Sequence, residues 1–530
     1  MNLDLWALGL GSDGLPLMGD VLMRVFARSG LHARAWASRV RVPCERAVLR
    51  LTAGQERRHD APSACGILVA FDAQALRLKA GEASGAVLFD PDKATAEPAS
   101  LRRHAAAIGL SSFGLRLEPA RWRMAALGGV ARLAGMDLTV LEGALRAVLQ
   151  GEEAASMAAD LQAARAGFDA VGAQSPEAGA RLGRSDRGRL VLSGSGALGL
   201  GVIAGGCKFV AAGPRAAESE SFSWLASRAG RSGVILHRAA DDHSAVAAAL
   251  GAGLAGCRAA ALVMETGCAE RGLEFAERAE VPVVVASLRG AKAPVDGRGS
   301  CRAVLEPTSP ADALDAALDA FNIAERFQVP TLLRLDESLL WGWQTAERVR
   351  LDAPMDRGSW AAPEAGAEAF DRYAAGEDGI SARAVPGHEG LMFRTREAAS
   401  SAKLSAKRES LGRGVPIPLL EGPSDADATL VAAGSSAGVM RQVMHRLNVD
   451  GARCVNVLAL RCLSPFPAEA ASGALKSAKR LIAVEAGPSG SLCRLIRGET
   501  GVLVSRSCAG AEGPPDEAAL SRAVDEALHD

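Results

Sequence analysis

The alternation of short apolar runs with helical segments between residues 190 and 343 constrains the fold of this 530-residue chain most strongly. Three apolar runs, at residues 234–236, 260–264 and 281–286, are separated by segments of helical character. Strands that alternate with helices form parallel sheets covered on both faces. We therefore predict an α/β domain with a doubly wound parallel sheet in this part of the chain.

Polar residues follow each of the three apolar runs. In open α/β sheets, ligands bind at the carboxyl ends of the strands. The residues that this rule places along one rim are Asp241, Asp242, His243, Glu265, Thr266 and Arg289. The sequence thus predicts a ligand site at this edge of the sheet.

A second α/β region precedes this one. It opens with an apolar run and the glycines of a Gly-x-Gly-x-x-Gly loop, Gly9, Gly11 and Gly14, before a helix that ends near Gly30. This context suits a dinucleotide site, but no acidic residue follows about twenty residues later, as such sites require. The alternative is that the glycines only permit a tight turn and close packing. A helical stretch is expected from about residue 121 to 173.

A third α/β region is predicted near the carboxyl terminus. Apolar runs at residues 428–433, 455–460 and 481–485 are expected to be strands of a short parallel sheet. Residues 174–188 carry no apolar periodicity and are expected to form a linker. Residues 344–420 are predicted to be largely irregular, and a stretch of that length usually wraps other domains or a partner.

The composition excludes several classes of protein. The net charge of −1 gives no reason to expect nucleic acid or an acidic membrane surface as a partner. No apolar run approaches the roughly 18 residues that span a bilayer, and the first residues lack the basic region of a signal peptide. We expect a cytoplasmic protein. The ten cysteines form no Cys-x-x-Cys pair, so we expect neither a zinc site nor an iron–sulfur cluster on this chain.

Four short segments and the order of the three regions carry a resemblance to a known family. The segments are residues 319–330, residues 370–387 with their Glu-Asp-Gly-Ile-Ser run, residues 463–467 (Leu-Ser-Pro-Phe-Pro) and residues 513–516. They resemble fused γ–α subunits of the 2-oxoacid:ferredoxin oxidoreductases, in particular the 2-oxoglutarate type. The similarity covers nearly the whole chain.

The resemblance implies three doubly wound parallel-sheet domains. They are a γ-like α/β domain (1–175), a pyrimidine-type thiamine diphosphate-binding domain (190–345) and a transketolase C-terminal-like domain (425–530). A linker (176–189) joins the first two, and an irregular crossing segment (346–424) joins the last two. The resemblance also implies a β subunit as partner, which carries Mg²⁺ and an iron–sulfur cluster, in a heterodimer or a dimer of heterodimers. Ferredoxin, a 2-oxoacid and CoA are the other partners implied.

The implied site departs from the family at three places. The Glu that shares a proton with the aminopyrimidine ring falls at His243, which could donate a proton only as an imidazolium. A hydroxyl that contacts the substrate carboxylate falls at Ala216, although the neighbouring Arg215 could hold a carboxylate. Residues 265–268 replace the family's Thr-Ser-Gly-Pro-Gly turn. Asp242 points about 100° away from His243 on a helix and cannot simply replace the Glu.

The resemblance therefore gives two sets of candidate residues. The candidate catalytic residues are His243, Arg215 and Asp242. The candidate residues for binding thiamine diphosphate are Ser219, Glu220, Thr266, Gly267 and Arg289. No metal ligand is expected on this chain.

Each candidate also has a purely structural interpretation. His243 and the two aspartates before it are typical of a helix start, where they cap the helix. Arg215 is typical of a solvated charge, and Arg289 could reach only the partner chain. Three functions stay open at this point: a subunit of an oxidative decarboxylase, a non-catalytic structural or regulatory relative, and a thiamine enzyme with altered chemistry.

Overall fold

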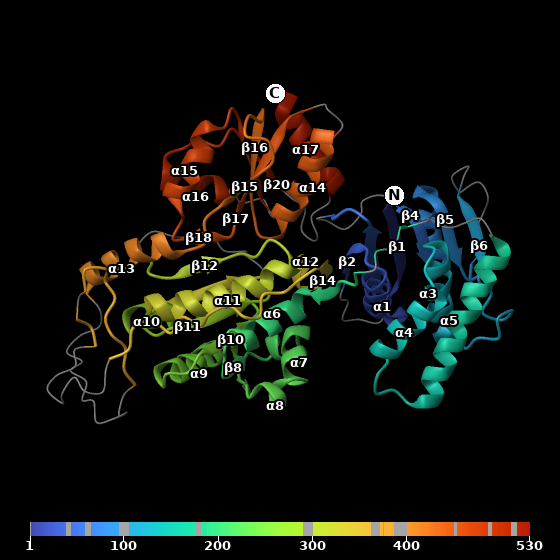
Figure 1. Cartoon of the computed structure of the whole chain (residues 1–530), viewed down its shortest axis with the longest axis horizontal. Coiled ribbons are helices and arrows are strands. Elements are labelled where there is room, and N and C mark those ends of the chain that lie inside the picture. Colours follow the sequence, from blue (N-terminus) through green and yellow to red (C-terminus); the bar gives the residue numbers. More distant parts are fainter. Residues whose placement is uncertain are drawn as a thin grey trace. The chain divides into compact units, whose positions relative to one another are not determined.

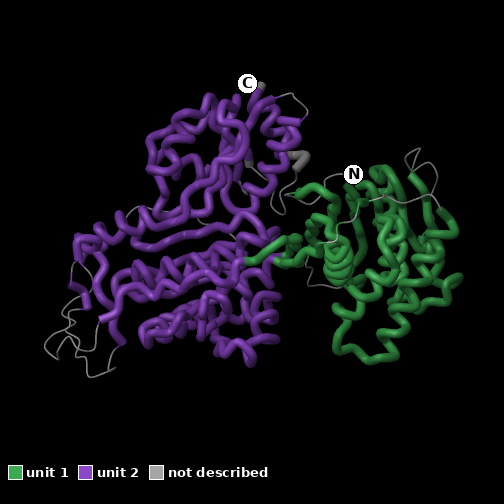
Figure 2. The backbone as a smooth tube through the Cα atoms, viewed as in Figure 1, with its two compact units in different colours: residues 1–193, 341–349 green, residues 194–340, 350–530 purple. Residues whose placement is uncertain are grey.

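Three sheets flanked by helices make up the α/β fold (Figure 1). The computed structural model describes residues 2–38, 44–58, 65–94, 105–175, 182–183, 185, 187–289, 300–361, 372–374, 376–385, 400–449, 453–485, 490–509 and 517–529. The chain forms two compact units, residues 1–193 with 341–349 and residues 194–340 with 350–530 (Figure 2). The predicted fold class is confirmed. The predicted domain boundaries stay predictions.

The first unit contains an eight-stranded mixed sheet. Its strands, in spatial order, are β6 (Ala106–Gly109), β5 (Ala83–Phe89), β4 (Cys65–Ala70), β1 (Asn2–Leu10), β3 (Arg46–Gly54), β2 (His32–Ala37), β14 (Gly342–Ala346) and β7 (Leu190–Ser193). The pairs from β6 to β1 are parallel, and those from β1 to β7 are antiparallel. The half of the sheet from β6 to β1 is therefore parallel, as predicted for this region, and the half from β3 to β7 is antiparallel.

Helix α1 (Leu15–Arg28) packs against this sheet and shares a buried hydrophobic cluster with its strands. Its apolar residues recur at helical spacing, and Met18, Val21 and Phe26 are fully buried. The helix ends where Gly30 adopts a φ of 74°, a conformation that glycine tolerates at no steric cost. The predicted helical stretch after residue 121 is observed as α3 (Trp122–Leu133), α4 (Leu138–Val148) and α5 (Ala154–Gln174).

The second unit contains a seven-stranded sheet that is almost entirely parallel. Its strands, in spatial order, are β18 (Cys462–Ser464), β12 (Ala303–Leu305), β13 (Pro330–Arg334), β11 (Val283–Ser287), β10 (Ala259–Val263), β8 (Phe209–Ala212) and β9 (Ile235–Arg238). Helices α9 (Asp242–Leu254) and α11 (Pro310–Phe327) lie on opposite sides of the central strands (Figure 1). Strands β10 and β11 are consequently buried on both faces.

The same unit contains a five-stranded sheet formed by the carboxyl-terminal region. Its strands are β15 (Leu419–Glu421), β17 (Val455–Leu460), β16 (Ala428–Ala433), β19 (Leu481–Glu485) and β20 (Arg506–Ala509). The three strands predicted from the sequence are β16, β17 and β19. Directly after β17 the chain enters β18, which pairs antiparallel with β12 and so extends the seven-stranded sheet.

The stretch predicted to be irregular contains regular structure. Within residues 344–420 the described residues form the end of β14, the helix α13 (Ser401–Gly414) and the start of β15. The helix was missed because its buried positions include Lys403, Lys407 and Ser410, which give no apolar periodicity. Among the described residues, no helix combines the length and the apolar character needed to cross a bilayer.

Candidate functional site

The predicted rim lies along the carboxyl ends of the strands of the seven-stranded sheet. Strands β9, β8, β10, β11 and β13 end next to one another in this unit, in the spatial order that the sheet fixes. The segments that follow them therefore meet at one edge. The candidate residues all belong to these segments, so the topology brings them to the same edge of the sheet.

The loop after β8 is held against the start of α9. Gly213 lies so close to Asp242 that a Cβ on this glycine would be 1.8 Å from Oδ1 of the carboxylate. Arg215 is exposed, and Ala216 is fully buried. Ser219 caps the short helix α7 (Glu220–Ala226), since its Oγ accepts a hydrogen bond of 3.2 Å from the Phe222 amide. The structure thus gives Ser219 a capping contact within its own helix.

Two adjacent aspartates begin α9, and they have different environments. Asp241 is the N-cap, and its Oδ1 accepts a 2.6 Å hydrogen bond from the Ser244 amide. Asp242 is half-buried, and its Oδ2 accepts a 3.1 Å hydrogen bond from the Met264 amide at the end of β10. Burial raises the pKa of Asp242, although the amide bonds and the Arg215 guanidinium act in the opposite direction. The Asp242 carboxyl group therefore joins α9 to β10.

His243 follows these two aspartates and is exposed. The Ser244 amide, which donates a hydrogen bond to Asp241, lowers the pKa of that carboxyl group, and His243 acts in the same direction. His243 is exposed, whereas the neighbouring Asp242 is half-buried and its carboxyl group accepts the Met264 amide. The two adjacent side chains therefore have different surroundings.

The segments after β10 and β11 are joined by an ion pair. Arg289 Nη1 lies 3.5 Å from Oε1 of Glu265, and Arg289 Nε lies 3.9 Å from Oε1 of Glu337. Thr266 is half-buried at the start of a 3₁₀ turn, and Gly267 is exposed with open space where a Cβ would stand. Packing therefore does not require a glycine at position 267.

Sequence reasoning missed the acidic residues that follow β12 and β13. Glu306 follows β12, and Asp336 and Glu337 follow β13, so all three lie at the same carboxyl edge as the rim. Glu306 forms a 2.9 Å ion pair with Arg334, and burial raises the pKa of Glu306. The rule that we applied to the first three apolar runs would have found these residues, had residues 303–305 and 330–334 been recognised as strands.

The rim does not reproduce the carboxylate contact that an aminopyrimidine ring needs. His243, to which the resemblance assigns the family's acidic residue, is exposed, and the carboxyl group of the neighbouring Asp242 accepts the Met264 amide. A buried Ala216 offers no hydroxyl. The exposed His243 and the buried Ala216 supply neither the carboxylate nor the hydroxyl that the resemblance implies, so no reaction step is assigned to thiamine diphosphate here. In the described part of the chain, no three His, Cys, Asp or Glu side chains are placed to hold a metal ion.

The glycine-rich loop of the first unit is a tight turn closed by a carboxylate. Asp13 Oδ2 accepts a 2.6 Å hydrogen bond from the Leu10 amide, and a Cβ on Gly9 would lie 2.4 Å from this oxygen. Gly14 has a φ of 71°. A carboxylate inside the loop opposes the binding of a phosphate group. The contacts therefore favour the interpretation of these glycines as packing residues.

Two family models match the chain. The model described as "Pyruvate ferredoxin/flavodoxin oxidoreductase" matches residues 5–170. The model described as "Pyruvate flavodoxin/ferredoxin oxidoreductase, thiamine diP-bdg" matches residues 200–397. A thiamine diphosphate-binding type of domain is thus present in the region that carries the rim.

Curated relatives agree with these matches. Subunit alpha of 2-oxoacid:ferredoxin oxidoreductase 2 from Aeropyrum pernix is 28% identical over 315 residues, which cover 52% of this chain and 48% of the relative. Subunit alpha of 2-oxoacid:ferredoxin oxidoreductase 1 from Sulfurisphaera tokodaii is 25% identical over 62% of this chain and 60% of the relative. 2-Oxoglutarate oxidoreductase subunit KorA from Mycobacterium tuberculosis is 30% identical over 37% of this chain and 32% of the relative. The chain thus spans about half to three fifths of the first relatives that it matches.

One solved structure shares the fold over nearly the whole chain. It is the 2-oxoglutarate:ferredoxin oxidoreductase from Magnetococcus marinus, solved with 2-oxoglutarate, coenzyme A and succinyl-CoA bound. The TM-score is 0.88, the identity is 23%, and the match covers 99% of both chains. At this identity the likeness establishes the architecture.

Proposed function

Since the chain belongs to the family of 2-oxoacid:ferredoxin oxidoreductase α subunits, we propose that it is the γ–α subunit of a 2-oxoacid:acceptor oxidoreductase. The reaction would be the oxidative decarboxylation of a 2-oxoacid to an acyl-CoA, with electrons passing to ferredoxin. A β partner would supply the diphosphate and Mg²⁺ site and an iron–sulfur cluster. We expect the complex to be a heterodimer or a dimer of heterodimers in the cytoplasm.

The exposure of the rim is the observation that carries this proposal. Arg215, His243, Glu265 and Gly267 are exposed at the carboxyl edge of a sheet whose core strands are fully buried. Pockets for cofactors usually enclose most of the ligand surface. The exposure of these residues, in the part of the chain that the structure describes, supports a rim that forms half of a pocket and that a second chain closes.

Arg215 and Arg289 are the residues that we propose to contact anionic groups. A guanidinium can bind a carboxylate with two parallel hydrogen bonds. Arg215 is exposed beside the position where the family has a hydroxyl for the substrate, so we assign it to the 2-oxoacid carboxylate. Arg289 is already oriented by Glu265 and Glu337, which suits a fixed contact to the cofactor or to the partner chain.

The test is co-expression with a β-type chain. Thiamine diphosphate content and viologen reduction that depends on both a 2-oxoacid and CoA should be measured on the purified complex. Bound cofactor with turnover supports the proposal. A stable complex that contains no thiamine diphosphate contradicts it.

The role of His243 is tested in the same complex. If its imidazolium donates to the aminopyrimidine ring, His243→Ala should lower turnover at least about tenfold. This is a lower limit, because a positioned acid or base typically contributes about a hundredfold or more to the rate. Unchanged turnover in the variant would remove His243 from the site.

A non-catalytic relative of the subunit is the second candidate function. The buried Ala216 and the exposed His243 favour it, because both replace groups with a chemical role in the family. Such a chain would bind a β-type partner and serve a structural or regulatory purpose. A thiamine enzyme with altered chemistry is a third candidate, and it predicts bound cofactor without CoA-dependent turnover.

A further inference from the structure

Strand β9 forms one side of the seven-stranded sheet in the second unit. In the described part of the chain it pairs with β8 alone. The Ile235 and Ala239 amides donate hydrogen bonds of 2.8 and 2.9 Å to carbonyls on the β8 side. Because amides alternate in direction along a paired strand, those of Leu236 and Arg238 point away from β8. A further strand can therefore pair with this side of the sheet. We call residues 228–238 the β9 edge.

Positive charge gathers at the β9 edge. Between residues 221 and 240 the sequence contains Arg228, Arg231, Arg238 and His237, and it contains no aspartate or glutamate. All four side chains are exposed. Two of the arginines belong to the short helix α8 (Ala229–Ser232) and its N-cap, directly before the strand. Like charges on an edge strand oppose pairing with a second copy of the same strand, so this edge is protected against itself.

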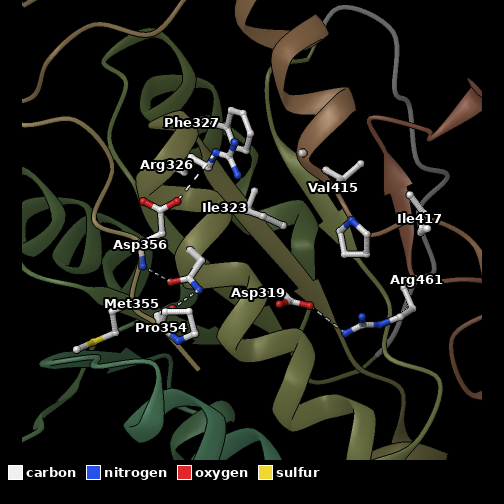
Figure 3. A pocket seen from close by; sticks show the side chains of 13 residues that line it. Asp319, Ile323, Arg326, Phe327, Pro354, Met355, Asp356, Val415, Ile417 and Arg461 are labelled. Carbon is white, nitrogen blue, oxygen red and sulfur yellow. Dashed lines mark hydrogen bonds and ion pairs between the residues drawn. The ribbon is translucent and has the colours of Figure 1, made fainter. Parts of the chain in front are cut away.

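The charge of the β9 edge is not cancelled by acidic side chains. In the described part of the chain, no ion pair involves any of its three arginines. The groove beside the second half of α11 shows the opposite arrangement (Figure 3). There Arg461 Nη2 lies 3.3 Å from Asp319 Oδ2, and Arg326 Nε lies 4.0 Å from Asp356 Oδ2. The positive charge of the β9 edge is thus available to a partner.

Aromatic rings hold two of the three arginines. The guanidinium carbon of Arg228 lies 4.0 Å from the centre of the Trp224 ring, and that of Arg238 lies 5.3 Å from the centre of the Phe222 ring. Such contacts orient a guanidinium and leave its charge in place. A side chain that is oriented before binding loses less conformational entropy when a partner arrives. The β9 edge therefore presents its charge in a fixed arrangement.

The β9 edge also offers an apolar contact. Ile235 is 65% exposed, and His237 stacks on Phe209 with the ring centres 6.2 Å apart. Ile235 and His237 are two residues apart in a strand, so their side chains lie on the same face. A single exposed isoleucine is normal on a protein surface. Here it lies beside unpaired backbone groups and uncancelled charge, which together suit an extended chain.

We propose that the β9 edge binds an extended, acidic segment of another protein as an added strand. The backbone of the segment pairs with the amides of Leu236 and Arg238, and its carboxylates contact Arg228, Arg231 and Arg238. In recognition of this kind, main-chain hydrogen bonds give affinity and side chains give specificity. A nucleic acid matches the charge but not the row of backbone groups, so the edge favours a protein segment.

Fluorescence anisotropy with the full-length chain tests the charge contacts. The probe is a labelled peptide of alternating glutamate and threonine, about eight residues long, as natural strands are. We expect Arg228→Glu combined with Arg231→Glu to weaken peptide binding at least about tenfold, because like charges then face each other. Arg271→Glu combined with Arg278→Glu is the matched control, since both arginines are exposed on α10 (Glu270–Arg278). The control makes the same change of net charge and should bind the peptide as the wild type does, at a salt concentration that screens charges more than about 8 Å apart.

Two further measurements test the backbone contacts. Leu236→Pro removes an amide that points away from β8, a position at which an edge strand tolerates proline. The variant should bind the peptide at least about tenfold more weakly, with its melting temperature as the check of folding. A peptide of alternating glutamate and proline has the same charge but lacks half of the amides, and the wild type should bind it more weakly by a similar factor. This comparison needs no variant.

Four outcomes overturn the proposal. They are a wild type that does not bind the glutamate–threonine peptide, equal affinities of the Arg228 and Arg231 variant and its control, equal affinities of the wild type for the two peptides, and a folded Leu236→Pro variant with wild-type affinity. Tighter binding of a single-stranded RNA of equal charge also overturns it, in favour of a nucleic acid. None of these readouts needs cofactor or turnover, so the outcome is independent of the proposed function.

Discussion

Asp242 connects three segments of the rim through one carboxyl group. Its Oδ2 accepts the Met264 amide at the end of β10, and its Oδ1 packs against Gly213 after β8, while the residue itself begins α9. The side chain thus fixes the relative positions of two strand ends and a helix start. The neighbouring Arg215, which we assign to the substrate carboxylate, follows Gly213 by two residues. Its placement therefore depends on the contact between Gly213 and Asp242.

Gly213→Ala should destabilise the second unit because its Cβ would lie 1.8 Å from Asp242 Oδ1. Forcing an extra carbon into a packed contact costs about 1–3 kcal/mol. We expect the urea midpoint of the variant to fall accordingly. In a background with Asp242→Ala the same substitution should cost less, because the clashing carboxyl is gone. If Gly213→Ala lowers the stability equally in both backgrounds, the Asp242 carboxyl group is not the cause of the loss.

The half-buried carboxyl of Asp242 also predicts a pH dependence of stability. Because burial raises its pKa in the folded state, folding favours the protonated form. The contribution of this group is therefore most favourable below the unfolded pKa of about 3.9 and is lost as pH rises through the higher folded pKa. Asp242→Asn keeps an oxygen for the Met264 amide and does not titrate.

The measurement is the free energy of unfolding of the wild type and Asp242→Asn between acidic and neutral pH. As pH rises through this window, the wild type should lose stability relative to the variant. Asp241→Asn is the matched control, and it should show the opposite trend, because the Ser244 amide lowers the pKa of Asp241. A difference between wild type and Asp242→Asn that does not change with pH would contradict the expected shift.

The sequence predicted which residues lie on the rim but not where their side chains point. The order of strands and polar segments was enough to place Asp242, His243 and Arg289 at one edge. The direction of Asp242 toward Met264 depends on the pairing of β8 with β10, and the contact of Arg289 with Glu337 depends on the pairing of β11 with β13. These pairings are long-range, and a single sequence gives no local signal for them.

At the scale of secondary structure elements, α13 is held by buried charges. Three basic groups contact one carboxylate: Lys403 Nζ and Arg372 Nη1 lie 2.9 Å and 2.8 Å from Glu280 Oε2, and Lys407 contacts Oε1. The two lysines and Glu280 are fully buried, and burial lowers the pKa of Lys407. The part of the crossing segment around Arg372 is thereby tied both to α13 and to the end of α10 (Glu270–Arg278). The apolar rule for helices could not find this element, because its core contacts are ionic.

Glu280→Gln should therefore be strongly destabilising. It removes the negative charge that three buried basic groups contact, and breaking a buried ion pair in this way costs about 3–5 kcal/mol. The amides of α13 should also exchange faster with solvent, in line with this loss of stability. Glu82→Gln is the matched control, since Glu82 forms a half-exposed ion pair with Lys79, which is worth at most about 1 kcal/mol. A Glu280→Gln variant as stable as the control would show that the lysines are uncharged in the folded protein.

At the scale of the whole molecule, the first unit is built from two distant parts of the sequence. Strand β14 pairs with β2 and β7, although six strands of the second unit's seven-stranded sheet, β8 to β13, lie between β7 and β14 in the chain. Its Trp343 is buried in the same hydrophobic cluster as α1 and lies near Gly19. The chain therefore returns to the first sheet after it has formed most of the seven-stranded sheet.

Trp343→Ala should consequently destabilise the first unit although residue 343 follows most of the seven-stranded sheet in the sequence. Replacing a buried tryptophan by alanine costs about 3–5 kcal/mol, and the loss is local to the cluster that contained the ring. Faster hydrogen exchange is expected in α1 and β2, with little change in β11 and β13. Phe321→Ala is the matched variant, since Phe321 is buried in α11 of the second unit, and it should give the reverse pattern. If both substitutions accelerate exchange equally in both units, the two units unfold together and the molecule behaves as one cooperative body.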